Sequence, residues 1–261
     1  MTPATWGVIV LVVTFVGMLA IRIPVSFCLL LSSIFAALTC GQGISSLVQA
    51  MAKGVCDSIV MTGVSVLLAY LVGVPLGVIL VITAKNGLHP KPVLNAVLGW
   101  IVNVLRSIPF IILLVCIIPF TRLVAGTSLG VPGAIVPLTV CAIPFVARMV
   151  EQSLADIDGG LVEAGQSFGA NTWQLVTKVY LKESLPSLIR GAAITFITLF
   201  GYAAMAGCVG AGGLGDIAIR YGYQRYKVDV MIVSVVLCVI LVQVIQSVGD
   251  VIARKTDKRT R

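Results

Sequence analysis

The sequence predicts an all-α fold, a polytopic bundle of membrane-spanning helices, and three observations lead to that prediction. Hydrophobic residues make up 59% of the 261 residues and charged residues only 11%, with a mean hydropathy of +1.09. A soluble domain carries roughly 45–50% apolar and about 25% charged residues, so these charges are too few to cover a water-facing surface. Apolar runs also recur along the chain, separated by polar or glycine-rich loops. Several of them reach the roughly 20 residues that a helix needs to cross a bilayer core.

Residues 47–261 are expected to form one transmembrane domain with five spans. The apolar runs cover residues 60–83, 93–120, 129–150, 188–209 and 228–248. Residues 1–46 form a hydrophobic N-terminal extension, interrupted by Arg22 and Pro24. A single helix there would be about 50 Å long, too long for one crossing, and an arginine at mid-membrane is costly. We therefore expect two short spans in the extension and seven in all, with one span there, and six in all, as the alternative.

The net charge of +8 comes from basic residues that lie between the apolar runs and in the C-terminal tail. The positive-inside rule explains this distribution, so no nucleic-acid partner is expected. With the tail inside the cell, residues 85–91 and 151–186 are also inside and residues 210–227 are outside. The three basic residues of that outer loop, Arg220, Arg225 and Lys227, depart from the rule.

The residues offer no catalytic chemistry. Seven cysteines form no C-x-x-C pair, and His89 is the single histidine, so no metal site is expected. No G-x-x-x-x-G-K-[ST] loop is present to hold ATP, and the acidic residues lie at span ends or in loops. We expect a protein that is not an enzyme, needs no cofactor and takes any driving force from elsewhere.

The longest polar stretch, residues 151–187, is built like two short helices joined at a glycine. Residues 161–168 form the first, Gly169 interrupts it, and the second begins at Asn171, where Gln174 completes a capping-box pattern. Apolar residues of the second helix share one face: Leu175, Val176, Val179 and Tyr180. Two interpretations follow from periodicity alone: a knob that inserts into a partner's groove, or an amphipathic segment that rests on lipid headgroups.

The spacing within this stretch resembles the EAA loop of importer permeases driven by ATP-binding cassettes. Glu163-Ala164-Gly165 is followed by three residues and Gly169, then by nine residues, Val179, one residue and Leu181. In that family the loop is a coupling helix that docks on a cytoplasmic ATPase. The sequence departs from the pattern where Gly165 replaces the second alanine and Lys182 replaces the proline. Leu185-Pro186 comes four residues later, which predicts about one extra helical turn.

Further segments resemble the methionine importer permeases, and together with the loop they cover about residues 47–252. They begin at Arg106, Ile118, Pro144 and Gly210. The resemblance implies a methionine permease of the bacterial inner membrane, two copies of it, a separate ATPase and an extracytoplasmic substrate-binding protein. Residues 1–46 instead resemble the start of the large membrane subunit of TRAP-class secondary transporters. A subunit of an ion-gradient-driven carrier is therefore the alternative function.

Other residues admit two interpretations each. Met205 lies among small residues, where a flexible thioether can gate a pore or simply pack between helices. Arg148 and Glu151 are spaced to form an i, i+3 ion pair, although interfacial anchoring also explains the arginine. Pro109, Pro119 and Pro144 lie within spans and are expected to kink them.

Overall fold

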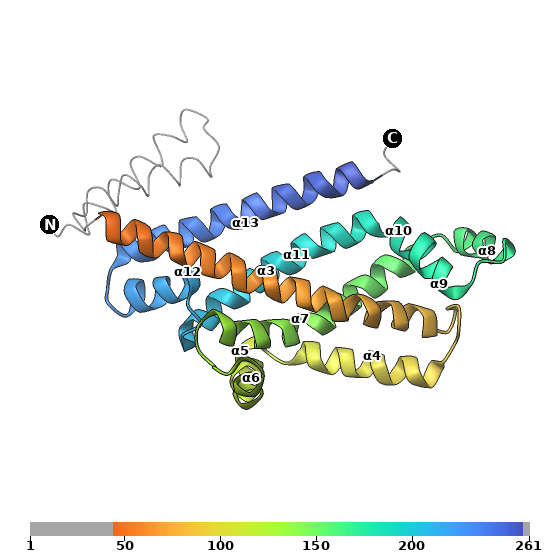
Figure 1. Ribbon diagram of the computed structural model, residues 1–261, viewed down its shortest axis with the longest axis horizontal. Helices are drawn as coiled ribbons and strands as arrows, with labels where there is room; N and C mark the ends of the chain where they lie inside the picture. The colour runs from red at the N-terminus through yellow and green to blue at the C-terminus, as the bar shows by residue number, and fades with distance from the viewer. Residues whose placement is uncertain (1–43, 258–261) are drawn as a thin grey trace. The chain divides into compact units, whose positions relative to one another are not determined.

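The structure, a computed structural model, describes residues 44–257 and consists of helices and connecting loops, with no strand in that part (Figure 1). The chain divides into two compact units. The first holds residues 44–62 together with Ile118–Ile135 and Phe200–Val244, and the second holds Gly63–Ile117, Val136–Leu199 and residues 245–257. The expected spans of residues 1–46 fall almost wholly outside the described residues.

Four helices of the described part are long and apolar enough to cross a membrane: α3 (Ile44–Thr83), α7 (Gly130–Ala155), α11 (Leu185–Ala206) and α13 (Val228–Thr256). A fifth crossing results if α4 (Pro92–Ser107) and α5 (Phe110–Cys116) count as one bent span. This agrees with the five spans expected for residues 47–261.

The apolar run at residues 93–120 bends sharply, which confirms the kink predicted at Pro109. The axes of α4 and α5 meet at 98°, and α6 (Ile118–Ala125) follows. The bend lies at Ile108-Pro109, where Ile108 is extended with ψ of 122°. A proline disfavours helical backbone in the residue before it and lacks an N–H for the helix ladder. Pro144, in contrast, lies inside the continuous helix α7.

Helix α3 begins well before the expected span at residue 60. At 40 residues it is about 60 Å long, twice the thickness of a bilayer core. Polar residues such as Lys53, Asp57 and Ser58 weaken the hydropathy signal here without breaking the helix. One of them has a structural role in the first unit, because the buried Ser58 hydroxyl accepts a hydrogen bond from the Leu214 N–H at 2.9 Å.

Small residues bring the helices of the second unit together. Gly73 and Gly77 form a G-x-x-x-G pattern on α3, and a Cβ at either position would lie about 2.7 Å from Val146 or Val150 of α7. A Cβ on Gly191 of α11 would likewise lie too close to the Met149 side chain of α7. The helices therefore pack at distances that larger side chains would not allow.

One polar group links α4 and α7. The Arg148 guanidinium donates to Glu151 at 2.6 Å, which confirms the predicted i, i+3 pair, and also donates to Asn103 of α4 at 3.1 Å. Both charged side chains are only partly exposed. The pair therefore fixes the position of α4 beside α7 in addition to neutralising its own charges.

Candidate functional site

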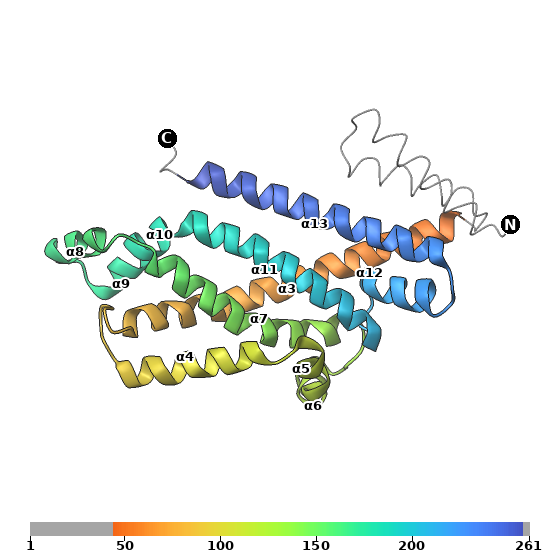
Figure 2. The same ribbon diagram turned by 180° about the vertical axis from the view of Figure 1, so that it is seen from behind.

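The polar stretch at residues 151–187 folds as a helical hairpin in the second unit. It consists of α8 (Gly159–Ser167), α9 (Thr172–Gln174), η1 (Leu175–Tyr180) and α10 (Leu181–Glu183), and we call it the α8–α10 hairpin. Asp158 caps α8, since its carboxylate accepts from the Gly160 N–H at 2.9 Å. Figures 1 and 2 both place α8 and α9 at one end of this unit, beside the turn between α3 and α4.

Gly169 forms the turn of the hairpin, as expected. Its φ is +75°, a left-handed conformation that glycine adopts without strain. The Ala170 N–H donates to the Gly165 carbonyl and the Gly169 N–H to the Gln166 carbonyl, the two bonds of a Schellman motif. The chain therefore reverses sharply after α8 with its last carbonyls satisfied.

The predicted capping box at the start of α9 is confirmed. The Gln174 N–H donates to the Asn171 side chain at 2.8 Å, and the Asn171 N–H donates to the Gln174 side chain at 2.9 Å. The predicted extra turn is also present, because helical residues continue through Glu183 and Leu185 and Pro186 begin α11. Lys182 is exposed on α10 in that extra turn.

Gly165 lets the two arms of the hairpin approach each other. A Cβ at this position would lie 2.7 Å from Leu175 Cδ2 and 3.8 Å from Val179 Cγ2. This gives a physical reason for glycine where the EAA pattern has its second alanine. Gly165 and Val179, two of the expected site residues, therefore meet inside the hairpin.

The apolar face of the second helix packs within the protein and is not available to lie on lipid. Leu175 is 3% exposed and Val176 6%, and Tyr180 is also buried. Burial raises the pKa of the Tyr180 phenol above its ordinary value, so the ring remains neutral. Since the amphipathic interpretation requires this face to contact headgroups, the structure favours a preformed knob.

Two aromatic side chains flank the turn and are almost fully exposed. Phe168 is 91% exposed and Trp173 74% exposed, on either side of Gly169. Sequence reasoning did not single them out, although two aromatic residues around a glycine in the longest polar stretch were a usable signal. Exposed aromatic side chains on a rigid turn are the type of residue that anchors protein interfaces.

The other expected residues lie along the two arms. Glu163 and Ala164 are exposed on α8, and Leu181 is half-buried at the start of α10. Glu163 also lines a cavity of about 520 Å³ between the end of α3 and the first arm of the hairpin. Glu163, Ala164 and Gly169 are therefore exposed, whereas Gly165 and Val179 lie where the two arms approach each other.

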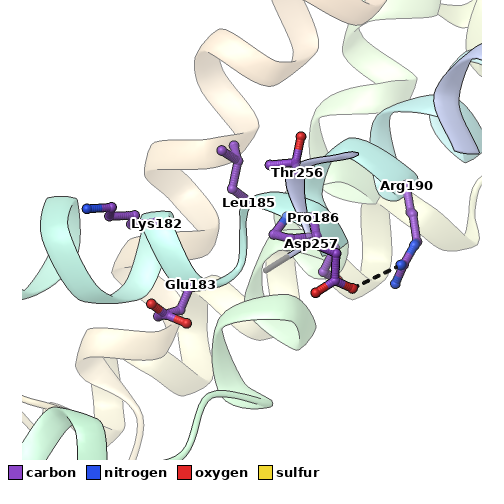
Figure 3. A pocket seen from close by; sticks show the side chains of 8 residues that line it. Lys182, Glu183, Leu185, Pro186, Arg190, Thr256 and Asp257 are labelled. Carbon is purple, nitrogen blue, oxygen red and sulfur yellow. Dashed lines mark hydrogen bonds and ion pairs between the residues drawn. The ribbon is translucent and has the colours of Figure 1, made fainter. Parts of the chain in front are cut away.

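A second pocket, of about 260 Å³, lies where the hairpin ends (Figure 3). Side chains of both charges line it, and Arg190 of α11 donates to Asp257 at 3.3 Å. Arg190 is half-exposed, so this ion pair contributes at most about 1 kcal/mol. This ion pair links Asp257, the last described residue, to Arg190 near the start of α11.

Met205, the expected gate, belongs to the first unit and lies one residue before the end of α11. Its side chain is 50% exposed. A Cβ on Gly201, one helical turn earlier, would have no atom within 4 Å. The helix face that carries Met205 is therefore open in a single copy of the chain.

The fold and its surface define a class of protein. Large apolar side chains point outward from the helices, for example Leu71 of α3 at 73% exposure and Leu123 of α6 at 82%. Exposed apolar surface on this scale requires lipid as the solvent. The chain is a polytopic membrane protein with a preformed polar hairpin outside its spans.

Comparison with known proteins narrows this class to one family. Residues 73–261 match the family described as the binding-protein-dependent transport system inner membrane component. The probable D-methionine transport system permease protein MetI of Vibrio cholerae is 50% identical over 203 residues, which cover 78% of this chain and 90% of that protein. The methionine import system permease protein MetP of Bacillus subtilis is 42% identical and covered to 82%. A solved chain of the MetNI methionine ABC transporter in inward-facing conformations is 50% identical, with a TM-score of 0.79, covering 80% of this chain and 97% of that one.

This chain therefore belongs to the family of inner membrane components of binding-protein-dependent transport systems.

Proposed function

We propose that this chain is the membrane permease of an ATP-driven importer of methionine, in the L or D form. The observation that carries the proposal is the 50% identity to a chain of the MetNI methionine ABC transporter over 97% of that chain's length. The permease relatives from Vibrio cholerae and Bacillus subtilis are also named for methionine transport. The TRAP-like alternative is not favoured, because residues 73–261 match the other family.

The α8–α10 hairpin is the contact with a separate ATPase in this proposal, within a cytoplasmic loop at residues 151–187. Its arms approach each other at Gly165 and Val179 and reverse at Gly169, with Leu181 half-buried in the second arm, and it presents Glu163 and Ala164 outward. A preformed knob loses little conformational entropy when it docks, which favours tight and mechanically stiff coupling. ATP is hydrolysed in the partner, and this chain performs no covalent step.

The rest of the assembly follows from the same proposal. Residues 47–261 form the transmembrane domain, and residues 1–46 are an appended hydrophobic extension. A second copy of the chain completes the pathway, and an extracytoplasmic binding protein delivers the amino acid. Met205 is the proposed gate, supported by the 50% exposure of its side chain near the end of α11. Two such residues, one from each copy, would close the path with flexible apolar side chains.

Uptake into proteoliposomes tests the function directly. The chain is reconstituted with its candidate ATPase and binding protein, and entry of labelled methionine is followed with ATP, with ATP and vanadate, or with an imposed proton or sodium gradient. The proposal predicts uptake that requires ATP and stops with vanadate. Uptake that follows an ion gradient and ignores vanadate would contradict it and support the secondary-transporter alternative.

A further inference from the structure

A hydrogen bond connects the α8–α10 hairpin to a loop distant in the sequence. His89 Nε2 lies 2.8 Å from the Thr172 hydroxyl, although 83 residues separate the two. His89 lies in the turn between α3 and α4, and Thr172 is the first residue of α9. The chain itself connects the hairpin to α7 through residues 156–158 and to α11 through Ser184, but not to α3.

The turn that carries His89 is firmly attached to the end of α3. The His89 N–H donates to the Ile82 carbonyl at 3.0 Å, and the Lys91 N–H donates to the Thr83 carbonyl at 3.1 Å. The Asn95 side chain of α4 donates to the Leu80 carbonyl at 2.7 Å. A displacement of His89 therefore displaces the last turn of α3 and the first turn of α4 with it.

Thr172, the other partner in this hydrogen bond, is also fixed in position by local hydrogen bonds. Thr172 directly follows Asn171, the residue whose reciprocal capping bonds with Gln174 set the start of α9. On the other arm, Glu163 and Gln166 of α8 line the 520 Å³ cavity whose opposite wall includes Asn86 and Leu88. That cavity leaves the α8 arm incompletely packed on the turn between α3 and α4. The contact at Thr172 is therefore suited to transmit force between the hairpin and this turn.

We propose that His89 is a positioning residue that transmits movement of the hairpin to α3 and α4. This inference rests on the proposed function, in which an ATPase moves the hairpin. The chain joins the hairpin to α7 and α11 covalently, and the bond from His89 to Thr172 joins it to the turn between α3 and α4. Loss of this bond uncouples ATP hydrolysis from transport without separating the ATPase from the permease.

The test uses the complete transporter in proteoliposomes and measures methionine molecules imported per ATP hydrolysed. The variants are His89→Ala, Thr172→Val and their combination, with His89→Gln as the conservative variant that can still reach the hydroxyl. Lys91→Ala is the matched control, an exposed residue of the same turn. One solvent-exposed hydrogen bond contributes little to global stability, so these variants are expected to fold.

We expect the coupling ratio to fall about threefold or more in His89→Ala and in Thr172→Val, and no further in the double variant, since both remove one interaction. His89→Gln and Lys91→Ala should keep the wild-type ratio, and the ATPase should co-purify with all variants. An unchanged ratio in His89→Ala, or two single effects that multiply in the double variant, would overturn the inference. Loss of the ATPase from His89→Ala would also overturn it, because His89 would then act in assembly.

Measurements on the wild-type transporter distinguish a failure of this inference from a failure of the proposed function. If wild-type proteoliposomes show no ATP-driven uptake, the proposed function fails and the role of His89 fails with it. If wild type imports methionine with ATP and His89→Ala keeps the wild-type ratio, only the role of His89 is overturned.

Discussion

Exposed aromatic residues at the hairpin turn are the strongest residue-level indication of a partner. Phe168 and Trp173 remain exposed although the neighbouring Leu175 and Val176 are buried. Covering such a side chain is worth roughly 1.5–3 kcal/mol, so a rigid turn that keeps two of them exposed favours association with another surface. The packing of the hairpin buries Leu175, Val176 and Tyr180 and leaves these two aromatic side chains exposed.

Trp173→Ala is therefore expected to weaken binding of the ATPase by about tenfold or more, because buried tryptophan anchors commonly contribute at least about 2 kcal/mol. Titration of the detergent-solubilised permease with its ATPase measures the affinity. Tyr223→Ala is the control, since Tyr223 is 73% exposed but belongs to the first unit. Equal affinities for Trp173→Ala and wild type would remove Trp173 from the interface.

Gly169→Ala should destabilise the hairpin locally by about 1–2 kcal/mol, because an L-residue is strained in the left-handed conformation that Gly169 adopts at φ +75°. Gly169→Asn should cost less, since asparagine tolerates this region better than alanine does. Hydrogen exchange of the amides at residues 159–183 measures the effect. Faster exchange in the asparagine variant than in the alanine variant would contradict the conformational explanation.

The residues of this site were predictable only in part. The glycine break and the capping box at Asn171 and Gln174 follow from local backbone chemistry, which sequence spacing records. The roles of Glu163 and Ala164 came from resemblance to a family pattern. The exposure of Phe168 and Trp173 depends on how the two arms pack, and the contact between His89 and Thr172 joins residues 83 positions apart. No local pattern encodes the contact between His89 and Thr172, whereas the two aromatic residues around a glycine were visible in the sequence.

At the scale of elements, close helix packing in the second unit depends on glycine. Gly73 and Gly77 of α3 present a surface with no side chains to Val146, Ala147 and Val150 of α7. In a membrane, hydrophobic burial does not drive two helices together. The van der Waals contacts made at this close approach stabilise the helix pair instead. The packing of α3 on α7 therefore depends on these two glycines as well as on Leu80, which is buried in one cluster with Ala147.

Gly77→Val should lower stability by roughly 1–3 kcal/mol, because any Cβ there would lie 2.7 Å from the Ala147 carbonyl oxygen as well as from Val150. Thermal unfolding of the purified protein in mild detergent measures the change. Gly99→Val on α4 is the control, since no atom lies within 4 Å of its Cβ position. Similar melting temperatures for both variants would show that α3 and α7 do not pack as described.

Sequence hydropathy located the elements better than it located their ends. It placed α7, α11 and α13 within a few residues at their N-termini, because long apolar runs bounded by polar loops carry a strong signal. It failed at α3, where polar residues at 53–58 lie in a helix that packs against α12 (Gly213–Asp216), with the Ser58 hydroxyl accepting from the Leu214 N–H. It also merged α4, α5 and α6 into one run, since hydropathy does not report the 98° bend at Ile108-Pro109.

For the whole molecule, composition alone identified lipid as the solvent. The 59% of hydrophobic residues and 11% of charged residues leave no other environment, and the outward-facing leucines of α3 and α6 agree. Composition could not predict the function, because the sequence shows no catalytic motif that would indicate a reaction. The function depends on partners that supply energy and substrate, so the decisive features are surfaces where another protein fits.

Docking of a separate ATPase on the α8–α10 hairpin can be tested by co-purification. The tagged chain is co-expressed with its candidate ATPase, isolated in mild detergent and compared with Gly169→Trp and Gly99→Trp variants. We predict that wild type and Gly99→Trp retain the ATPase, whereas Gly169→Trp, which places a bulky side chain on the left-handed turn, loses it. Absence of the ATPase from wild type, or its full retention by Gly169→Trp, would contradict the account.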